Sequence, residues 1–325
     1  MRLLQLLFLV AISQIAVAQR GNAEAVETTD VDHFWEAFDL LANCKSHSDS
    51  INTIQAVYLD RGTDGLKDFI KVRDFKAERF VTMIGRYPKF YASIRKNTLE
   101  VKNAAPLIEE VFKKFKEIYP NFEPFKVCFA VGPLVSGGTV SKNFVLIGSE
   151  ISTSTASVDI SEFKEGPLSK ILSRDTDVVQ KIKNMVAHEC VHTQQKTPAS
   201  RKAAKCILLY RILIEGAADF IGELVAGSQI NTVALEYGER HEQELWDQLK
   251  AEMCGKETTG WLYNFSTIKD KPADLGYYMG YTIAREYYKN AADKNQAVID
   301  ILEMNNPITF LEKSKYEQKE KGPGK

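Results

Sequence analysis

Apolar residues recur every three or four positions through most of this chain, which is the spacing of one face of a helix. The pattern predicts helices from Val31 to about Tyr119 and again from Asp175 to the end of the chain. Aromatic residues such as Phe34 and Phe38 fall on these apolar faces, so we expect them in the core rather than at a cofactor.

The pattern changes at Asn121. Two short apolar runs, FKVCFAV (residues 125–131) and NFVLIGSEI (residues 143–151), are rich in Val, Phe and Ile and predict paired strands. The link between them has the G-x-x-x-x-G spacing of a phosphate loop, but Gly138 and Thr139 stand where such a loop needs a lysine and a hydroxyl residue. We therefore expect a hairpin turn, in a mostly helical α+β protein.

The second helical region divides at glycine and proline residues. One helix is expected from near Asp177 through His192, and the next from Pro198 to a stop at Gly227. An amphipathic helix then covers residues 236–253. Asp274 is expected to cap the last strong helix, DLGYYMGYTIAREYYKNA.

Residues 1–18 have the composition of a secretory signal. Arg2 gives a positive start, an apolar run follows, and Ala16-Val17-Ala18 is a small-x-small cleavage pattern that leaves Gln19 as the first mature residue. A membrane anchor is the alternative, but the apolar run is short for a span of about 20 residues. We expect a secreted or periplasmic protein with no stable membrane insertion after the signal is removed.

Charge and cysteine content narrow the class further. The net charge of −1, from 42 basic and 43 acidic residues, leaves no basic excess for a phosphate backbone, so nucleic acid is not an expected partner. An apolar content of 44% with 26% charged residues is ordinary for a folded protein. The five cysteines include no CxxC pair, which excludes a cysteine zinc knuckle. One disulfide is compatible with export, with its pairing left open.

The chemistry is expected in the stretch MVAHECVHTQQK, residues 185–196. His188 and His192 are four residues apart, so they lie on one helix face and can bind one ion, while Glu189 flanks that face. This HExxH pattern is typical of a zinc site in which the glutamate acts as base on a water molecule. A buried helix with two hydrogen-bonded histidines is the alternative, and a third metal ligand distinguishes the two.

The next predicted helix supplies that ligand in LIEGAAD, residues 213–219. Glu215 follows His192 by 23 positions, which lets two helices converge on one Zn²⁺, and Asp219 lies one turn further on the same face. Asp219 can accept a hydrogen bond from a ligand imidazole and set its tautomer. The alternative, that both acids face solvent, is disfavoured because apolar residues surround them.

HExxH followed by ExxxD on the next helix resembles the thermolysin-type zinc peptidases, the gluzincins. The resemblance implies zinc ligands at His188, His192 and Glu215, Glu189 as general base, Asp219 behind a ligand histidine, and an antiparallel edge strand over the cleft. NFVLIGSEI is the candidate for that strand. From about Asn121 to Tyr288 the chain is also similar to a family of bacterial predicted zinc-dependent proteases related to gliding-motility lipoprotein B, through its strand pair, HExxH, an EG segment and the GYxxGY sequence of residues 276–281. No cysteine stands directly after the expected cleavage site, the first being Cys44, so the lipidation cysteine of that lipoprotein is missing here.

The negative charge that develops on a cleaved carbonyl needs a further hydrogen-bond donor. Tyr277, Tyr278 and Tyr281 are candidates, and we select Tyr281, with Arg285 one turn beyond it. Packing in the core is the alternative for each tyrosine. His241 is set aside because its neighbours are charged and predict a solvated face.

We therefore expect a mostly helical zincin-like fold of class α+β, with a small antiparallel sheet and the metal site between two helices. The predicted parts are a signal (1–18), a helical N-terminal region (19–120), a catalytic domain (121–312) and a flexible tail (313–325). The expected activity is hydrolysis of peptide or protein substrates. The alternatives are a non-catalytic cell-envelope accessory protein (secretion or motility) with a structural zinc site, and hydrolysis of a cell-wall peptide or a small amide.

Overall fold

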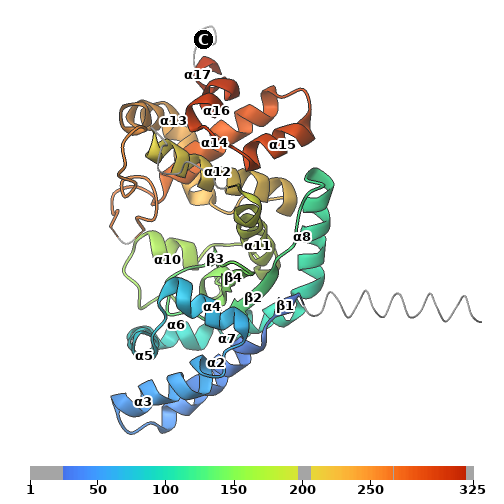
Figure 1. Cartoon of the computed structure of the whole chain (residues 1–325). Coiled ribbons are helices and arrows are strands. Elements are labelled where there is room, and N and C mark those ends of the chain that lie inside the picture. The colour runs from blue at the N-terminus through green and yellow to red at the C-terminus, as the bar shows by residue number, and fades with distance from the viewer. Residues whose placement is uncertain (1–24, 197–205, 266, 320–325) are drawn as a thin grey trace, which may run out of the picture.

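The computed structural model describes residues 25–196, 206–265 and 267–319. Helices dominate, and a four-stranded sheet lies between two helical groups (Figure 1). The predicted mostly helical α+β class is confirmed. One hydrophobic core includes residues on both sides of position 120, and the domain boundaries themselves stay predictions.

The sheet is mixed rather than antiparallel. Its order is β1-β2-β4-β3, with β2 parallel to β1 and β4, and β3 antiparallel to β4. The expected hairpin between the two apolar runs is wrong, because those runs pair in parallel as β2 and β4. The glycine-rich link contains a further strand, β3, which lies on the other side of β4 and forms the hairpin with it. The strands are β1 (Val26–Glu27), β2 (Lys126–Ala130), β3 (Gly138–Val140) and β4 (Phe144–Gly148).

Helices of the N-terminal region cover one face of the sheet, where α2 and α4 pack on β2, and α4 also on β4. Phe34 is buried there with its ring against those of Tyr58 and Tyr91, which are also buried, as expected for core aromatics. The elements are α2 (Thr29–Leu40), η1 (Leu41–Asn43), α3 (His47–Thr53), the π-helical η2 (Ile54–Leu59), α4 (Asp64–Arg73), α5 (Ala77–Arg86), α6 (Pro88–Ser93), α7 (Arg95–Leu99) and η3 (Glu100–Asn103).

The segment that leads into β3 is held by buried polar groups. The hydroxyls of Tyr58 and Tyr91 donate to the carbonyls of Val131 (2.7 Å) and Gly132 (3.0 Å). The buried carboxyl of Glu150 accepts from the backbone N–H of Gly132 at 2.6 Å and of Leu134 at 3.2 Å. The N-terminal helices therefore help to position β3.

The long helix α11 lies between the sheet and the C-terminal helices (Figure 1). The helix starts next to Asp177 as predicted, and the Asp177 side chain caps it by accepting from two backbone N–H groups. Gly227 follows the last residue of α12, also as predicted. The expected start of that helix at Pro198 lies outside the described residues. The elements are α8 (Ala105–Ile118), α9 (Ser149–Ser152), α10 (Pro167–Leu172), α11 (Val178–Gln194) and α12 (Ile207–Ala226).

The C-terminal helices enclose α12, which packs against α11 and α14. Asp274 precedes α14 as expected but does not cap it; its side chain accepts from the backbone N–H of Asn264 instead. A disulfide joins Cys206, before α12, to Cys254, after α13. These elements are α13 (Thr232–Glu252), α14 (Leu275–Asn290), α15 (Lys294–Leu302), α16 (Pro307–Ser314) and α17 (Tyr316–Lys319).

The remaining expectations concern the C-terminal tail, the N-terminal signal and a membrane span. Part of the expected flexible tail is helical, since α16 extends to Ser314 and α17 follows after one turn residue. Tyr316 of α17 is 1% exposed and packs against Trp246. The expected signal segment lies outside the described residues. Among the described helices, none combines the length and apolar character needed to cross a membrane.

Candidate metal centre

His188 and His192 lie one turn apart on α11, and the Nε2 atoms of both rings point toward the same site. Their Nε2 atoms are 3.1 Å apart. The next helix, α12, brings the carboxylate of Glu215 to the same place, with Oε2 3.3 Å from Nε2 of His192 and 3.8 Å from Nε2 of His188. The three residues that the sequence suggested as metal ligands therefore converge in the structure.

These three atoms have the spacing of zinc ligands. The point equidistant from them lies about 2.0 Å from each, and zinc binds imidazole nitrogen and carboxylate oxygen at about 2.0–2.2 Å. The remaining ring nitrogens are already engaged, since Nδ1 of His188 lies 2.8 Å from Oδ1 of Asp219 and Nδ1 of His192 lies 2.8 Å from Oε1 of Gln195. With protons on Nδ1, two imidazole lone pairs and a carboxylate oxygen face one another, which is favourable only around a cation or a proton. The donor set fits zinc.

Asp219 has the place predicted for it, behind His188. Its second oxygen, Oδ2, accepts from the side-chain amide of Asn231 at 2.7 Å, so the carboxylate is fixed from both sides. Asp219 is 2% exposed. A carboxylate held in this way orients the imidazole and raises its basicity as a ligand.

The electrostatics of the centre favour a bound positive charge. Burial alone would raise the pKa of Glu215, but the two facing imidazoles and the hydroxyl of Tyr263 outweigh it and lower the pKa to about 2. Burial works against the charged form of His192, yet Glu215 and Glu189 raise its pKa well above the ordinary value. The charged carboxylate of Glu215 and the imidazoles thus attract one another, and a cation is favoured at the point where they meet.

Glu189, the predicted general base, lies beside this centre against strand β3. Burial raises its pKa above the ordinary carboxyl value. A Cβ atom at Gly138 would approach Oε1 of Glu189 to 2.4 Å, so only glycine leaves space for the carboxylate at this position. Arg73, from the end of α4, reaches the same strand, its guanidinium 3.4 Å from the carbonyl of Gly138.

The tyrosine selected from the sequence points away from the centre. The hydroxyl of Tyr281 donates to Glu223 at 2.8 Å, and Arg285 lies over its ring, so the geometry does not support the predicted role of Tyr281. Tyr278 likewise pairs with Glu242. Of the three candidates on α14 it is Tyr277 that faces the centre, with its ring stacked on His188 at 6.1 Å between centroids.

Two residues at the centre were not found from the sequence. Tyr263 donates its hydroxyl to Oε1 of Glu215, and Arg73 lies close enough to Glu189 to stabilise the carboxylate form. Tyr263 belongs to an irregular segment with positive φ, where no periodicity marks a functional side chain. Arg73 lies in the N-terminal region, more than a hundred positions before His188, and nothing in its local sequence distinguishes it.

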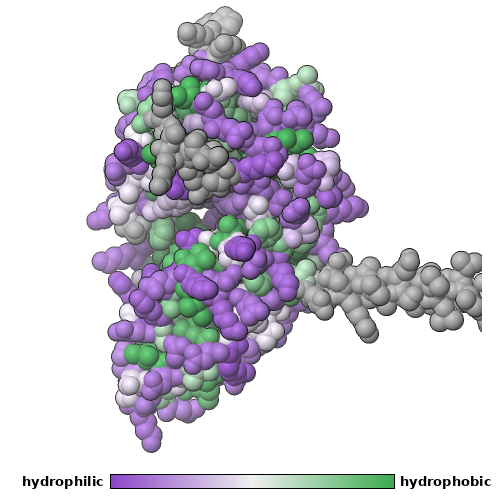
Figure 2. Space-filling model, in the orientation of Figure 1, coloured by the Kyte–Doolittle hydropathy of each residue, from purple (hydrophilic) through white to green (hydrophobic). Residues whose placement is uncertain are grey.

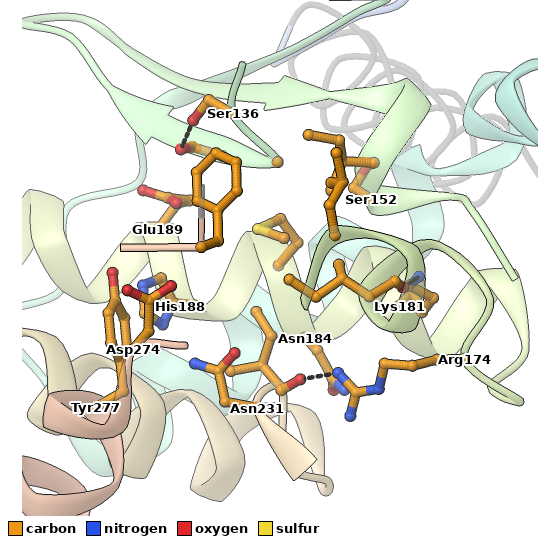
Figure 3. Close-up of a pocket in the computed structure, with 18 of the residues that line it drawn as sticks. Ser136, Ser152, Arg174, Lys181, Asn184, His188, Glu189, Asn231, Asp274 and Tyr277 are labelled. Atoms are coloured by element: carbon orange, nitrogen blue, oxygen red, sulfur yellow. Dashed lines mark hydrogen bonds between the residues drawn. The ribbon is translucent and has the colours of Figure 1, made fainter. Parts of the chain in front are cut away.

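The centre opens into a cleft formed by two adjoining cavities. One has a volume of about 360 Å³ and extends along α11 toward Arg174 and Lys181, as Figure 3 shows. The other, of about 330 Å³, passes His192 and Glu215 and is bordered by β3. His188, Glu189 and Tyr263 line both. In the space-filling view the surface is hollowed between the lower half of the molecule and the C-terminal helices, with apolar residues nearby (Figure 2).

Comparison with known proteins gives one finding, and it concerns the part of the chain that holds the centre. No curated protein and no solved structure matches this chain. Residues 165–306 match the model of a family described as predicted Zn-dependent protease (DUF2268). The matched region includes α11, α12 and α14 and supports a zinc protease family for this part of the molecule.

Proposed function

We propose that this protein is a secreted zinc-dependent peptidase that cleaves peptide bonds with Glu189 as general base. The observation that carries the proposal is the convergence of His188, His192 and Glu215 on one point, beside a buried glutamate and open to a cleft. Catalytic zinc sites have three protein ligands and an open position, whereas structural sites usually have four closed ligands. The family match of residues 165–306 agrees with this reading.

The chain's residues have distinct roles in this proposal. His188, His192 and Glu215 would hold the metal, and Asp219 would keep His188 in the tautomer that presents Nε2. When bound, zinc supplies a Lewis acid that polarises a carbonyl group and makes water more acidic. Glu189 then accepts the proton of the attacking water on its carboxylate and transfers it to the amine that leaves. The pKa of Glu189 is raised toward neutral pH, which suits a group that must both accept and release a proton.

Strand β3 is the candidate for holding the substrate backbone. It is the last strand in the sheet order, so its outer edge has no partner strand in the described part of the chain. Gly138, Thr139 and Val140 line the second cavity next to Glu189 and His192. An extended peptide can add to such an edge through main-chain hydrogen bonds. This assigns to β3 the edge-strand role that the sequence resemblance suggested for residues 143–151. Those residues instead form the interior strand β4 and the start of α9.

Two donors replace Tyr281 as candidates for stabilising the negative charge on the cleaved carbonyl. The donors are Arg73 and Tyr263, and both residues line the two cavities, whereas Tyr281 lines neither. Arg73 has the additional feature that its buried Nε makes no hydrogen bond within the described residues. A donor of this kind is available to a substrate oxygen.

Export is part of the proposal. The composition of residues 1–18 supports a cleaved signal, and the Cys206–Cys254 disulfide supports an oxidising compartment, because such bonds are rare in the cytosol. A secreted or periplasmic location follows.

The test compares the wild type with Glu189→Gln, which keeps the shape of the side chain but cannot accept the proton. We expect both to bind one zinc per chain by metal analysis, and only the wild type to cleave a peptide library. His192→Ala, as a control, should lose both metal and cleavage. If the wild type and Glu189→Gln bind zinc alike and neither cleaves any peptide, the catalytic proposal fails in favour of a structural zinc site in an accessory protein.

A further inference from the structure

Two partly buried cations line the first cavity at the end opposite to Glu189 and His188 (Figure 3). Lys181 lies on the same helix, α11, and Arg174 in the segment before it. Among the described residues neither forms an ion pair with a carboxylate. The ammonium group of Lys181 donates to the carbonyls of Ser154 and Ile171, and the guanidinium of Arg174 donates to the carbonyl of Ile230 and the hydroxyl of Thr232.

Positive groups in such a place are unfavourable unless an anion joins them. Burial, reinforced by the nearby Arg174, lowers the pKa of Lys181 to about 7. Burial also lowers the pKa of Arg174. The two acids lining the cavity, Glu189 and Asp274, lie at its other end in Figure 3, and the carboxylate of Asp274 already accepts the backbone N–H of Asn264. Glu236 and Asp219 act on Arg174 only through longer-range attraction, and within the described residues neither Lys181 nor Arg174 has a carboxylate in ion-pair contact.

A nearby hydroxyl at the cavity has no hydrogen-bond partner within the described residues. Ser152, at the end of α9, is 0% exposed, and its hydroxyl makes no hydrogen bond within the described part of the chain. Ser152 borders the same cavity as Lys181 (Figure 3). A buried hydroxyl is normally satisfied, so a ligand that accepts hydrogen bonds fits this end of the cavity.

The distance along α11 suits a substrate that also reaches the metal centre. Lys181 and His188 are seven residues apart, which is about 10 Å along a helix axis. Apolar residues also line the cavity, among them Leu168, Ile171, Met185 and Ile230. A flexible aliphatic stem that ends in a carboxylate matches this arrangement.

From these contacts we propose that the cavity is a specificity subsite for a carboxylate of the substrate, bound by Lys181 and Arg174 while the adjacent peptide bond lies beside Glu189. The inference rests on the proposed peptidase function and adds its substrate class, peptides with an acidic group next to the cleaved bond. The carboxylate can come from a glutamate side chain or from the free end of the peptide, and the same cations would bind either.

The test uses matched peptides that differ only in this group, with a glutamate against a glutamine and a free terminal carboxylate against its amide. In one of the two pairs, we expect the wild type to cleave the acidic peptide with a kcat/KM about 10- to 100-fold higher than its neutral partner. This is the size of effect expected from a hydrogen bond to a charged group. Lys181→Met should reduce the preference at least several-fold. If it does not fold, Arg174→Gln serves the same purpose. Lys183→Met is the control, since Lys183 lies on the same helix but pairs with Glu110 at 2.7 Å, and it should retain the preference.

Binding separates this inference from the catalytic proposal. Zinc-loaded Glu189→Gln protein should bind the acidic peptide more tightly than the neutral one, measured by fluorescence anisotropy without turnover. Preferential binding without cleavage by the wild type would keep the subsite and reject the peptidase. Cleavage with equal kcat/KM for all matched pairs would keep the peptidase and overturn the subsite.

Discussion

Gly216 lies where α12 and α14 cross, directly after the candidate ligand Glu215. A Cβ atom at this position would approach the backbone carbon of Gly280 and the backbone nitrogen of Tyr281 to 2.1 Å each. From the other helix, a Cβ atom at Gly280 would approach the carbonyl oxygen of Ile212 to 2.0 Å. The two helices are thus in backbone contact, which only glycine permits.

The change Gly216→Ala should therefore separate the helices. Ordinary contact begins near 3.4 Å, so the two backbones must move apart by more than 1 Å, and no flexible side chain is there to give way. Overpacking of this kind costs about 1–3 kcal/mol. Because the obstacle is backbone, we expect about 3 kcal/mol, which corresponds to a melting temperature lower by about 5 °C for a chain of this size. Separation would also displace Glu215 from the imidazoles and weaken zinc binding.

The assay is urea unfolding of metal-free protein, followed by zinc titration of the same variants. Gly85→Ala is the matched control, because Gly85 lies inside helix α5 and a Cβ atom there meets nothing within 4 Å. Gly85 lies in the last turn of α5, where the change is expected to be neutral or to stabilise by at most about 0.5–1 kcal/mol. Gly216→Ala protein as stable as the wild type, or an equal loss from Gly85→Ala, would refute the argument from helix contact.

Two further predictions concern buried carboxylates. Asp219→Asn should weaken zinc affinity by about 10- to 100-fold, because His188 loses the carboxylate that orients it. Competition with a chelator measures the change, and unchanged affinity would contradict this role of Asp219. Burial raises the pKa of Glu150 from 4.5 to about 7, so between these values the folded state retains a proton that the unfolded state releases. The free energy of unfolding should then fall as the pH rises through this range, and by pH 7.5 the wild type should lose about 3 kcal/mol relative to Glu150→Gln. Urea unfolding at several pH values measures this. A stability difference between the two proteins that does not change with pH would reject the assignment of Glu150 as a buried acid.

Local features of the structure were predictable where neighbouring residues determine them. The start of α11 at Asp177 and the stop of α12 at Gly227 follow from side-chain capping and from the left-handed conformation that glycine tolerates. The pair His188 and His192 shares a face because four residues make about one turn of any helix. Such features need no information from the rest of the chain.

The errors arise where distant segments meet. The strand direction of β2 and β4 was wrong because apolar alternation marks a strand but does not specify its partner's direction, and the short strand β3 in the link decided it. Tyr281 was selected from a helix whose rotation the sequence does not determine, and the packing of Gly280 on Ile212 turns Tyr277 toward His188 instead.

The sequence by itself determined the type of most elements, the HExxH pair and the candidate third ligand, because each depends on spacing within one or two helices. Only the tertiary structure decided which tyrosine faces the centre, that Arg73 of the N-terminal region borders the cleft, and that Lys181 and Arg174 line one cavity with no ion-paired carboxylate among the described residues. The physical reason is that a cleft is formed by side chains from elements far apart in the chain, and their mutual orientation is determined by packing between backbones rather than by local periodicity.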